Sequence, residues 1–150
     1  MTNEFVIGVV VSILSAIIAF YSAKNSIKSE VAKLKYDYDK RILDERLKYY
    51  PELLLLTQEI GKKKYGKQEN INIHKKAYED LLKWRTVGTG YLVLSKNALE
   101  CFNSIKDALS KEPSDGVNGY NKEQLEKIFK LRNSLRGALK DDIGIKIDIK

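Results

Sequence analysis

The sequence predicts an all-α protein with a single N-terminal transmembrane helix, a long juxtamembrane helical stalk and a small cytoplasmic helical bundle. Three observations carry this prediction. The chain opens with a long uncharged apolar run, the charged segment that follows contains neither proline nor glycine, and the remainder repeats apolar residues at spacings of three and four. The expected parts are a short extracytoplasmic tail (1–4), the transmembrane helix (5–23), the stalk (24–50) and the cytoplasmic helical domain (51–150).

The apolar run covers residues 5–23 and contains no charged residue and no proline. Nineteen helical residues rise about 28 Å, close to the roughly 30 Å hydrocarbon thickness of a bilayer. A core helix of a small protein normally keeps a polar stripe, whereas only hydroxyl groups interrupt this run. A cleaved signal would need a basic start, and the charged residue before the run is Glu4. We therefore favour a membrane anchor over a cleaved signal or a buried core helix.

Charge asymmetry predicts the orientation of this anchor. No basic residue precedes the run. Four lysines follow it within about a dozen residues: Lys24, Lys28, Lys33 and Lys35. Lys and Arg next to a span stay preferentially on the cytoplasmic side. We expect a single-pass protein of the cell (inner) membrane with its N-terminus outside and its C-terminal domain in the cytoplasm. The single cysteine, Cys101, agrees with a reducing compartment.

The overall charge is basic but spread along the chain, with a formal net charge of +7 over 150 residues. This modest excess suits a protein beside anionic lipid headgroups. Few aromatic residues accompany the basic clusters, which makes nucleic acid an unlikely partner. The expected partners are the lipid bilayer, further copies of the chain and an unidentified cytoplasmic protein.

Small residues recur along one side of the anchor at spacings of four and three. They form a predicted association seam: Gly8, Ser12, Ser15, Ala19 and Ser22. Small side chains let membrane helices approach closely, and serine hydroxyls can bond across the contact. The seam predicts self-association of the span. The competing interpretation is that small residues are common in membrane helices and that this spacing arises by chance. Because no charged residue lines the seam, the sequence does not favour a conducting pore.

The stalk is predicted to continue as an amphipathic helix. Apolar residues repeat at 4, 3, 4 in two runs separated by a phase shift: Ile27, Val31, Leu34, Tyr38, and then Leu43, Leu47, Tyr50, Leu54. Opposite charges four residues apart, such as Asp37 and Arg41, support helix formation. Two short runs fall below the three or four heptads that indicate a coiled coil. The stalk either pairs with copies of itself as a short coiled coil or packs onto its own domain, and both alternatives stay open.

Pro51 is expected to end or kink the stalk helix, because proline lacks a backbone donor. A helix from Pro51 would bury Leu53, Leu54, Leu56 and Ile60. Glycine and charge predict a loop over residues 61–70, and Asn72 is a plausible N-cap for a helix over 73–87. The glycines of residues 88–91 break that helix. Residues 92–94 are expected to be extended or a single turn.

Two further helices complete the predicted domain. Ser95 caps a helix over 96–111, and residues 113–119 have the composition of a loop. Asn121 and Gln124 have the form of a capping box at the start of the last helix. Gly144 should end that helix, leaving residues 145–150 as a loose tail.

No residue pattern points to a catalytic or metal site, and we predict no cofactor. His74 is the only histidine and is expected to be exposed near a helix start. One Cys and one His cannot supply a zinc site, and Cys101 is expected to face the core. Asp141 and Asp142 lie near a helix C-terminus and are expected to face solvent.

The polar pattern of greatest interest lies on the last helix, where three basic residues repeat every four positions. This basic ridge consists of Arg132, Arg136 and Lys140. Such a ridge could bind a phosphate-rich ligand or an acidic partner. The alternative is a solvated face whose arginines pair with Glu123, Glu126 or other acids.

Two functions are compatible with this sequence. The first is a non-enzymatic membrane-anchored interaction protein that self-associates through its span and presents its helical domain to a cytoplasmic partner. The second is a membrane-perturbing effector, such as a holin-like or defence protein, whose domain senses a ligand or partner. No motif in the sequence names a reaction.

Overall fold

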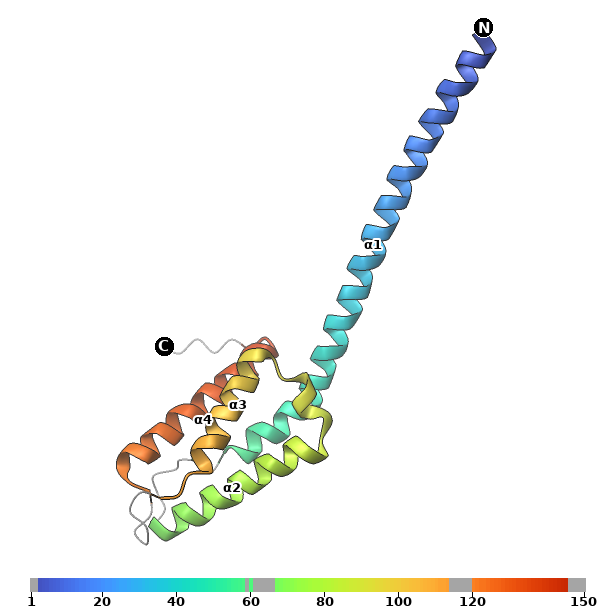
Figure 1. Ribbon diagram of the computed structural model, residues 1–150. Coiled ribbons are helices and arrows are strands. Elements are labelled where there is room, and N and C mark those ends of the chain that lie inside the picture. Colours follow the sequence, from blue (N-terminus) through green and yellow to red (C-terminus); the bar gives the residue numbers. More distant parts are fainter. Residues whose placement is uncertain (1–2, 59, 61–66, 114–119, 146–150) are drawn as a thin grey trace. The chain divides into compact units, whose positions relative to one another are not determined.

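The computed structural model describes residues 3–58, 60, 67–113 and 120–145, and every element in these ranges is helical. Four α-helices and one short 3-10 helix are present: α1 (Asn3–Leu56), α2 (Lys67–Val87), η1 (Thr89–Val93), α3 (Lys96–Leu109) and α4 (Lys122–Asp142). Figure 1 shows their order along the chain. The prediction of an all-helical chain is confirmed for the described residues.

The chain divides into two compact units, Met1–Arg41 and Ile42–Lys150. The first unit is the N-terminal part of α1. Among the described residues α1 is the one helix long and apolar enough to cross a membrane, and the apolar window near its N-terminus is not buried anywhere. The second unit contains the end of α1 together with the other helices, so residues 42–50 of the predicted stalk belong to it.

The core of the second unit takes side chains from every helix in it. In Figure 1 the last turns of α1, then α2, α3 and α4 run in alternating directions, and α3 lies along α4. Large side chains are fully buried on each helix: Tyr50 and Leu53 on α1, Leu81 on α2, Phe102 and Ile105 on α3, Leu135 and Leu139 on α4. Trp84 and Tyr91 pack their rings against Phe102, with centroids 5.7 and 5.8 Å away.

Pro51 neither ends α1 nor starts a new helix, so these two of the sequence expectations are wrong. The helix continues through it to Leu56. Proline within a helix costs about 3 kcal/mol because it removes a hydrogen bond and crowds the preceding turn. Burial of Tyr50 before it and Leu53 after it offsets this cost, since each large buried side chain contributes about 1.5–3 kcal/mol.

The second helix begins earlier than expected, at Lys67, so Asn72 lies inside α2 and is not its N-cap. Residues 67–70 contain Lys, Gln and Glu, which favour helix, and nothing after Gly66 interrupts them. The predicted loop over 61–70 is therefore wrong for residues 67–70, and its residues 61–66 lie outside the described ranges. The expected turn at 92–94 is found as η1, which ends at Val93.

The predicted caps of α3 and α4 are confirmed. The Ser95 hydroxyl accepts a hydrogen bond from the Ala98 backbone N–H at 3.1 Å. Asn121 and Gln124 form both bonds of a capping box, which satisfies two backbone donors at the start of α4. Gly144 has a φ of 75°, a left-handed conformation that glycine adopts without strain after a helix end. The expected loop at 114–119 and tail at 146–150 lie outside the described ranges.

Candidate functional site

The basic ridge of α4 contacts the C-terminal end of α1. Arg136 Nη1 donates to the Leu54 carbonyl oxygen at 2.6 Å and to the Thr57 hydroxyl at 3.3 Å. One turn earlier, Arg132 Nη1 donates to the Ile60 carbonyl oxygen at 2.8 Å. The last carbonyls of a helix have no partner within it, and positive charge there is favourable. Because α1 has no basic residue in its own last turn, α4 supplies this charge.

The Arg132 guanidinium makes further contacts that fix its position. It lies over the Phe129 ring, 4.2 Å from the centroid, and also donates to the Asn133 side-chain oxygen. Partial burial, and then the neighbouring charge of Arg136, lower the pKa of Arg132 from its usual value. The structure therefore brings Arg132 and Arg136 together at carbonyl oxygens, an arrangement that neither sequence interpretation of the ridge contained. Lys140 lies one turn further along α4 and is half-buried.

A second polar cluster joins the C-terminal end of α4 to α1. The Tyr50 hydroxyl donates to Asp142 Oδ2 at 2.7 Å, and the Ser95 backbone N–H donates to the same oxygen at 3.3 Å. Arg46 adds bonds to the carbonyl oxygens of Val93 (2.9 Å) and Asp142 (3.3 Å). Burial, and then the Asp142 carboxylate, raise the pKa of the Tyr50 phenol. The expectation that Asp142 faces solvent is wrong, because its carboxylate connects α1, α4 and the start of α3.

The two clusters have the same structural effect, one beside the middle of α4 and the other at its C-terminal end. Each uses a charged side chain to satisfy backbone groups that packing between helices removes from water. Groups of this kind are costly to leave unpaired, at about 1–3 kcal/mol each. Sequence spacing identified the arginines of one cluster but missed Arg46 and Asp142, whose partners lie about 50 to 100 positions away in the chain.

His74 is fully buried, which corrects the expectation of an exposed histidine. Because α2 begins at Lys67, His74 lies on the same side of the helix as Ala77 and Leu81, facing the core. Its ring packs edge-on against Tyr120 with centroids 4.8 Å apart. Burial lowers the pKa of His74 to about 4, so the ring is neutral at physiological pH.

Cys101 is half-buried and packs against the core, and burial, followed by the charge of Glu100, raises the pKa of its thiol. A thiol with a raised pKa is a poor nucleophile. Within the described residues, no group of three or more His, Cys, Asp or Glu side chains is placed to hold a metal ion.

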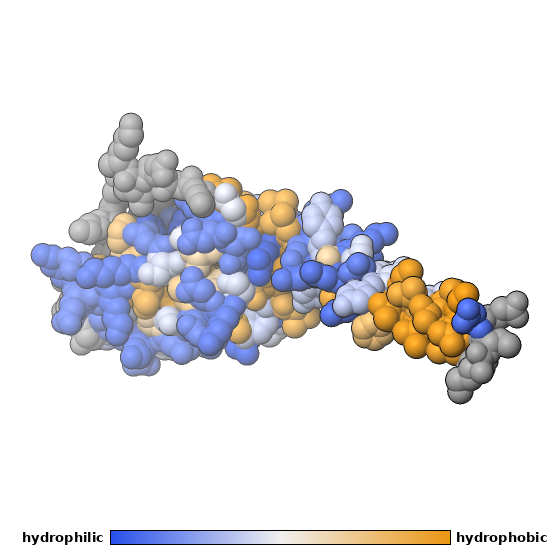
Figure 2. All heavy atoms as spheres, turned by 90° about the horizontal axis from the view of Figure 1, so that it is seen from above, coloured by the Kyte–Doolittle hydropathy of each residue, from blue (hydrophilic) through white to orange (hydrophobic). Residues whose placement is uncertain are grey.

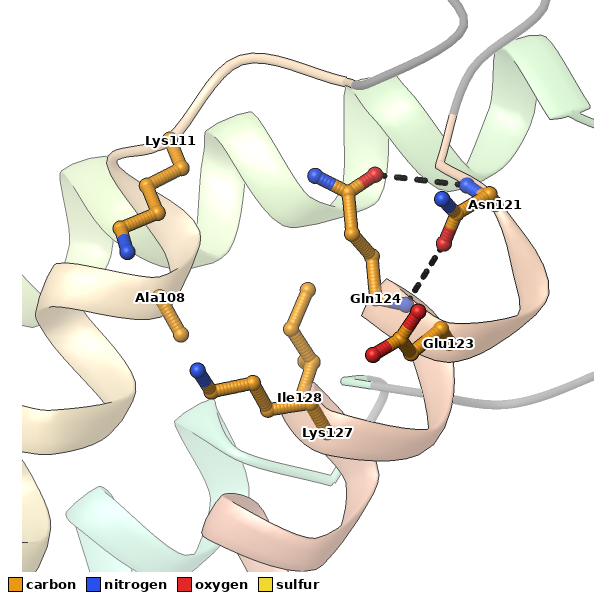
Figure 3. Close-up of a pocket in the computed structure, with 7 residues that line it drawn as sticks. All are labelled: Ala108, Lys111, Asn121, Glu123, Gln124, Lys127 and Ile128. Carbon is orange, nitrogen blue, oxygen red and sulfur yellow. Dashed lines mark hydrogen bonds between the residues drawn. The ribbon is translucent and has the colours of Figure 1, made fainter.

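A pocket of about 300 Å³ lies between α3 and the start of α4 (Figure 3). Lys111 and Lys127 lie on its border, together with the Asn121–Gln124 capping box and Glu123. Ala108 and Ile128 form its apolar part. Two amines and one carboxylate lie at its rim, so the lining carries a small net positive charge.

The residues of the association seam all lie on the exposed surface of α1. The Ser12 hydroxyl donates to the Gly8 carbonyl oxygen at 2.9 Å, a bond within the helix. This bond satisfies the hydroxyl hydrogen in the absence of water and leaves the oxygen lone pairs available to a neighbouring helix.

Comparisons of this chain with models of protein families, with curated proteins and with solved structures gave no match.

Proposed function

We propose that this protein is a non-enzymatic, single-pass membrane protein whose N-terminal helix self-associates and whose helical domain binds a cytoplasmic protein. The observation that supports it most strongly is the exposed apolar surface of the N-terminal part of α1. Large apolar side chains point outward on every side of this segment except the one that carries the small residues, and Figure 2 shows a continuous hydrophobic region on the face in view.

The exposed fractions of these side chains distinguish an anchor from a core helix. Ile7, Ile18 and Phe20 are 61%, 69% and 68% exposed, and none of the apolar window is buried within the chain. Soluble monomers rarely expose contiguous apolar patches larger than a few hundred Å². Each such side chain gains about 1.5–3 kcal/mol when it leaves water. Lipid is an environment that supplies this gain to all of these side chains at once.

The charges flanking the apolar run support a cytoplasmic second unit. The lysines at 24, 28, 33 and 35 lie after the run, where they would meet anionic headgroups on the cytoplasmic face. In this orientation Cys101 lies in a reducing compartment, in agreement with an unpaired thiol.

Self-association through the seam is supported by the absence of large side chains on that side of the helix. Gly8, Ser15 and Ala19 allow close approach of two backbones, and the Ser12–Gly8 bond satisfies the hydroxyl hydrogen of Ser12 within its own helix. The basic ridge is a weaker candidate for partner binding, since Arg132 and Arg136 bind carbonyl oxygens of α1. Lys140→Gln tests the ridge without disturbing those bonds.

Alkaline carbonate extraction of membranes containing the full chain tests the anchor. We expect the protein to stay in the membrane pellet, and an Ile13→Arg, Ile17→Arg variant to be released. An exposed pair on α3, Glu100→Arg with Asp107→Arg, controls for added charge. Release of the unaltered chain as a soluble monomer would refute the anchor and the proposed function with it.

Thiol labelling tests the orientation. In a Cys101→Ala background, we expect a membrane-impermeant maleimide to label Asn3→Cys in intact cells and Ser104→Cys only after lysis; both positions are exposed. The reverse pattern would place the helical domain outside.

Membrane potential separates the proposed function from a membrane-perturbing effector. We expect expression of the chain to leave the potential unchanged. A collapse that disappears when Ser12 and Ser15 are replaced by Leu would instead identify an effector. Crosslinking in native membranes, followed by mass spectrometry, would identify the cytoplasmic partner.

A further inference from the structure

The first unit carries an exposed apolar stripe that extends beyond the apolar run into a charged segment. This stripe consists of Ile27, Val31, Leu34 and Tyr38, whose side chains are 61%, 59%, 69% and 64% exposed. The surrounding residues are charged or polar, including Lys28, Glu30, Lys35 and Asp37. A lipid tail cannot cover these residues if they lie past the headgroups, so water or protein must.

The stripe lies on the opposite side of α1 from Ser29, the small residue at its own level of the helix. Each helical residue turns 100°, so Ser29, which continues the seam, points about 160° away from Val31 and about 140° from Leu34. A contact through Ser29 would therefore leave the stripe uncovered at this level of the helix.

We propose that a second copy of this chain covers the stripe, packing parallel to the first over residues 27–38. The spacing 4, 3, 4 is that of the two core positions of a heptad, with Ile27 and Leu34 at d and Val31 and Tyr38 at a. A β-branched residue at a followed by leucine at d favours two strands. The stripe ends at Tyr38, because Arg41 and Glu45 occupy the next core positions.

Charge selects the parallel arrangement. In this register Glu30 is at position g and Lys35 at position e of the next heptad. A parallel pair places each g residue beside the e residue of the following heptad on its partner. Glu30 of each copy therefore lies beside Lys35 of the other copy, which gives two pairs of opposite charges. An antiparallel pair would bring g residues together and e residues together, and like charges would face each other.

So short a contact can hold a stable dimer only if both chains are anchored in one membrane, so this inference rests on the proposed membrane anchor. Two heptads alone are marginal in water. Chains inserted in one bilayer share one orientation and a high local concentration, which turns a weak contact into a stable one. A helix that leaves the membrane as part of α1 is also already folded when its copies meet.

Disulfide trapping tests the contact in the full chain, purified and reconstituted in phosphatidylcholine vesicles. In a Cys101→Ala background, we expect Ile27→Cys to form a dimer rapidly on mild oxidation. Ser29→Cys, on the far side of the same turn, is the matched control and should form a dimer more slowly. Faster trapping at position 29, or equal trapping at both, would overturn the proposal.

Charge exchange tests the parallel register. Glu30→Lys alone and Lys35→Glu alone should each weaken dimer formation by about tenfold, since two attractive pairs become repulsive. The double exchange should restore it. Residues 30 and 35 lie about 140° apart on one helix, so rescue cannot arise within a chain. Failure of the double variant to recover would refute the parallel contact.

Carbonate extraction of each variant keeps the two proposals distinguishable. An Ile27→Cys chain that stays in the membrane but forms no disulfide-linked dimer would overturn the stripe contact and leave the anchor intact. Loss of the unaltered chain from the vesicles would overturn the anchor itself.

Discussion

The Arg136 guanidinium donates a 2.6 Å hydrogen bond to the Leu54 carbonyl oxygen, so a side chain of α4 completes the last turn of α1. The same nitrogen lies 3.3 Å from the hydroxyl of Thr57, which itself donates to Leu54. Thr57 is fully buried. A helix end that packs into a core needs partners for its carbonyls, and here they come from about 80 residues later in the chain.

Replacing Arg136 with Ala should lower the free energy of unfolding by about 1–3 kcal/mol, because the Leu54 carbonyl loses a charged donor. Denaturant unfolding of the detergent-solubilised protein, followed by the fluorescence of Trp84, measures this change; Trp84 is the only tryptophan and is 5% exposed. Lys130→Ala, at an exposed position on the same helix, is the matched control. Equal stability of the two variants would show that the bond contributes nothing.

Tyr50 and Asp142 should be energetically coupled, because the phenol donates to the carboxylate at 2.7 Å in a partly buried setting. Tyr50→Phe and Asp142→Asn should each destabilise the fold, and the double variant should lose less than the sum. We expect a coupling of about 0.5–3 kcal/mol from a double-mutant cycle. Additive single effects would show that the two groups act independently.

Gly90 and Gly137 should respond in opposite ways to alanine. A Cβ at Gly90 would lie 2.6 Å from Trp84 Cζ2 and 2.9 Å from Tyr49 Cβ, whereas one at Gly137 meets nothing within 4 Å. We expect Gly90→Ala to cost about 1–3 kcal/mol through overpacking. Gly137→Ala, inside α4, should stabilise by about 0.5–1 kcal/mol. Thermal unfolding measures the change in stability of each variant. Stabilisation by Gly90→Ala would contradict the close packing of Gly90 against Trp84 and Tyr49.

Acid should weaken the second unit through His74. Burial lowers the pKa of His74 in the folded state to about 4, below its ordinary value near 6.5. Between these values the unfolded chain binds the additional proton, so the free energy of unfolding falls as pH drops from 6.5 towards 4. The slope approaches about 1.4 kcal/mol per pH unit.

The His74→Leu variant isolates this contribution, because other groups titrate equally in both proteins. The stability of the unaltered chain should fall more steeply than that of the variant between pH 6.5 and 5. Parallel curves over that interval would show that His74 keeps an ordinary pKa in the folded protein.

Local signals in the sequence predicted the features that depend on neighbouring residues. The caps at Ser95 and at Asn121 with Gln124 require only residues three apart, and both are present. Apolar residues at helical spacing also predict which faces of α3 and α4 are buried, and Phe102, Ile105, Leu135 and Leu139 are buried in the structure.

Features that depend on distant residues could not be predicted in this way. Propensity rules place a helix end at Pro51, and only the burial of Tyr50 and Leu53 by other helices explains why α1 continues. The spacing of Arg132 and Arg136 was visible, but their partners at Ile60 and Leu54 depend on how α4 packs beside α1.

The burial of Tyr50 and Leu53 decides where this protein could be cut and remain folded. Proteolysis in the exposed part of α1 before Ile42 would release a fragment that retains its core and both polar clusters. Cleavage about ten residues later would remove Tyr50 and Arg46, leaving cavities, an Asp142 carboxylate without its phenol donor and an Asp142 carbonyl without its guanidinium donor. A shed, soluble form of the helical domain must therefore carry the last turns of the anchor helix with it.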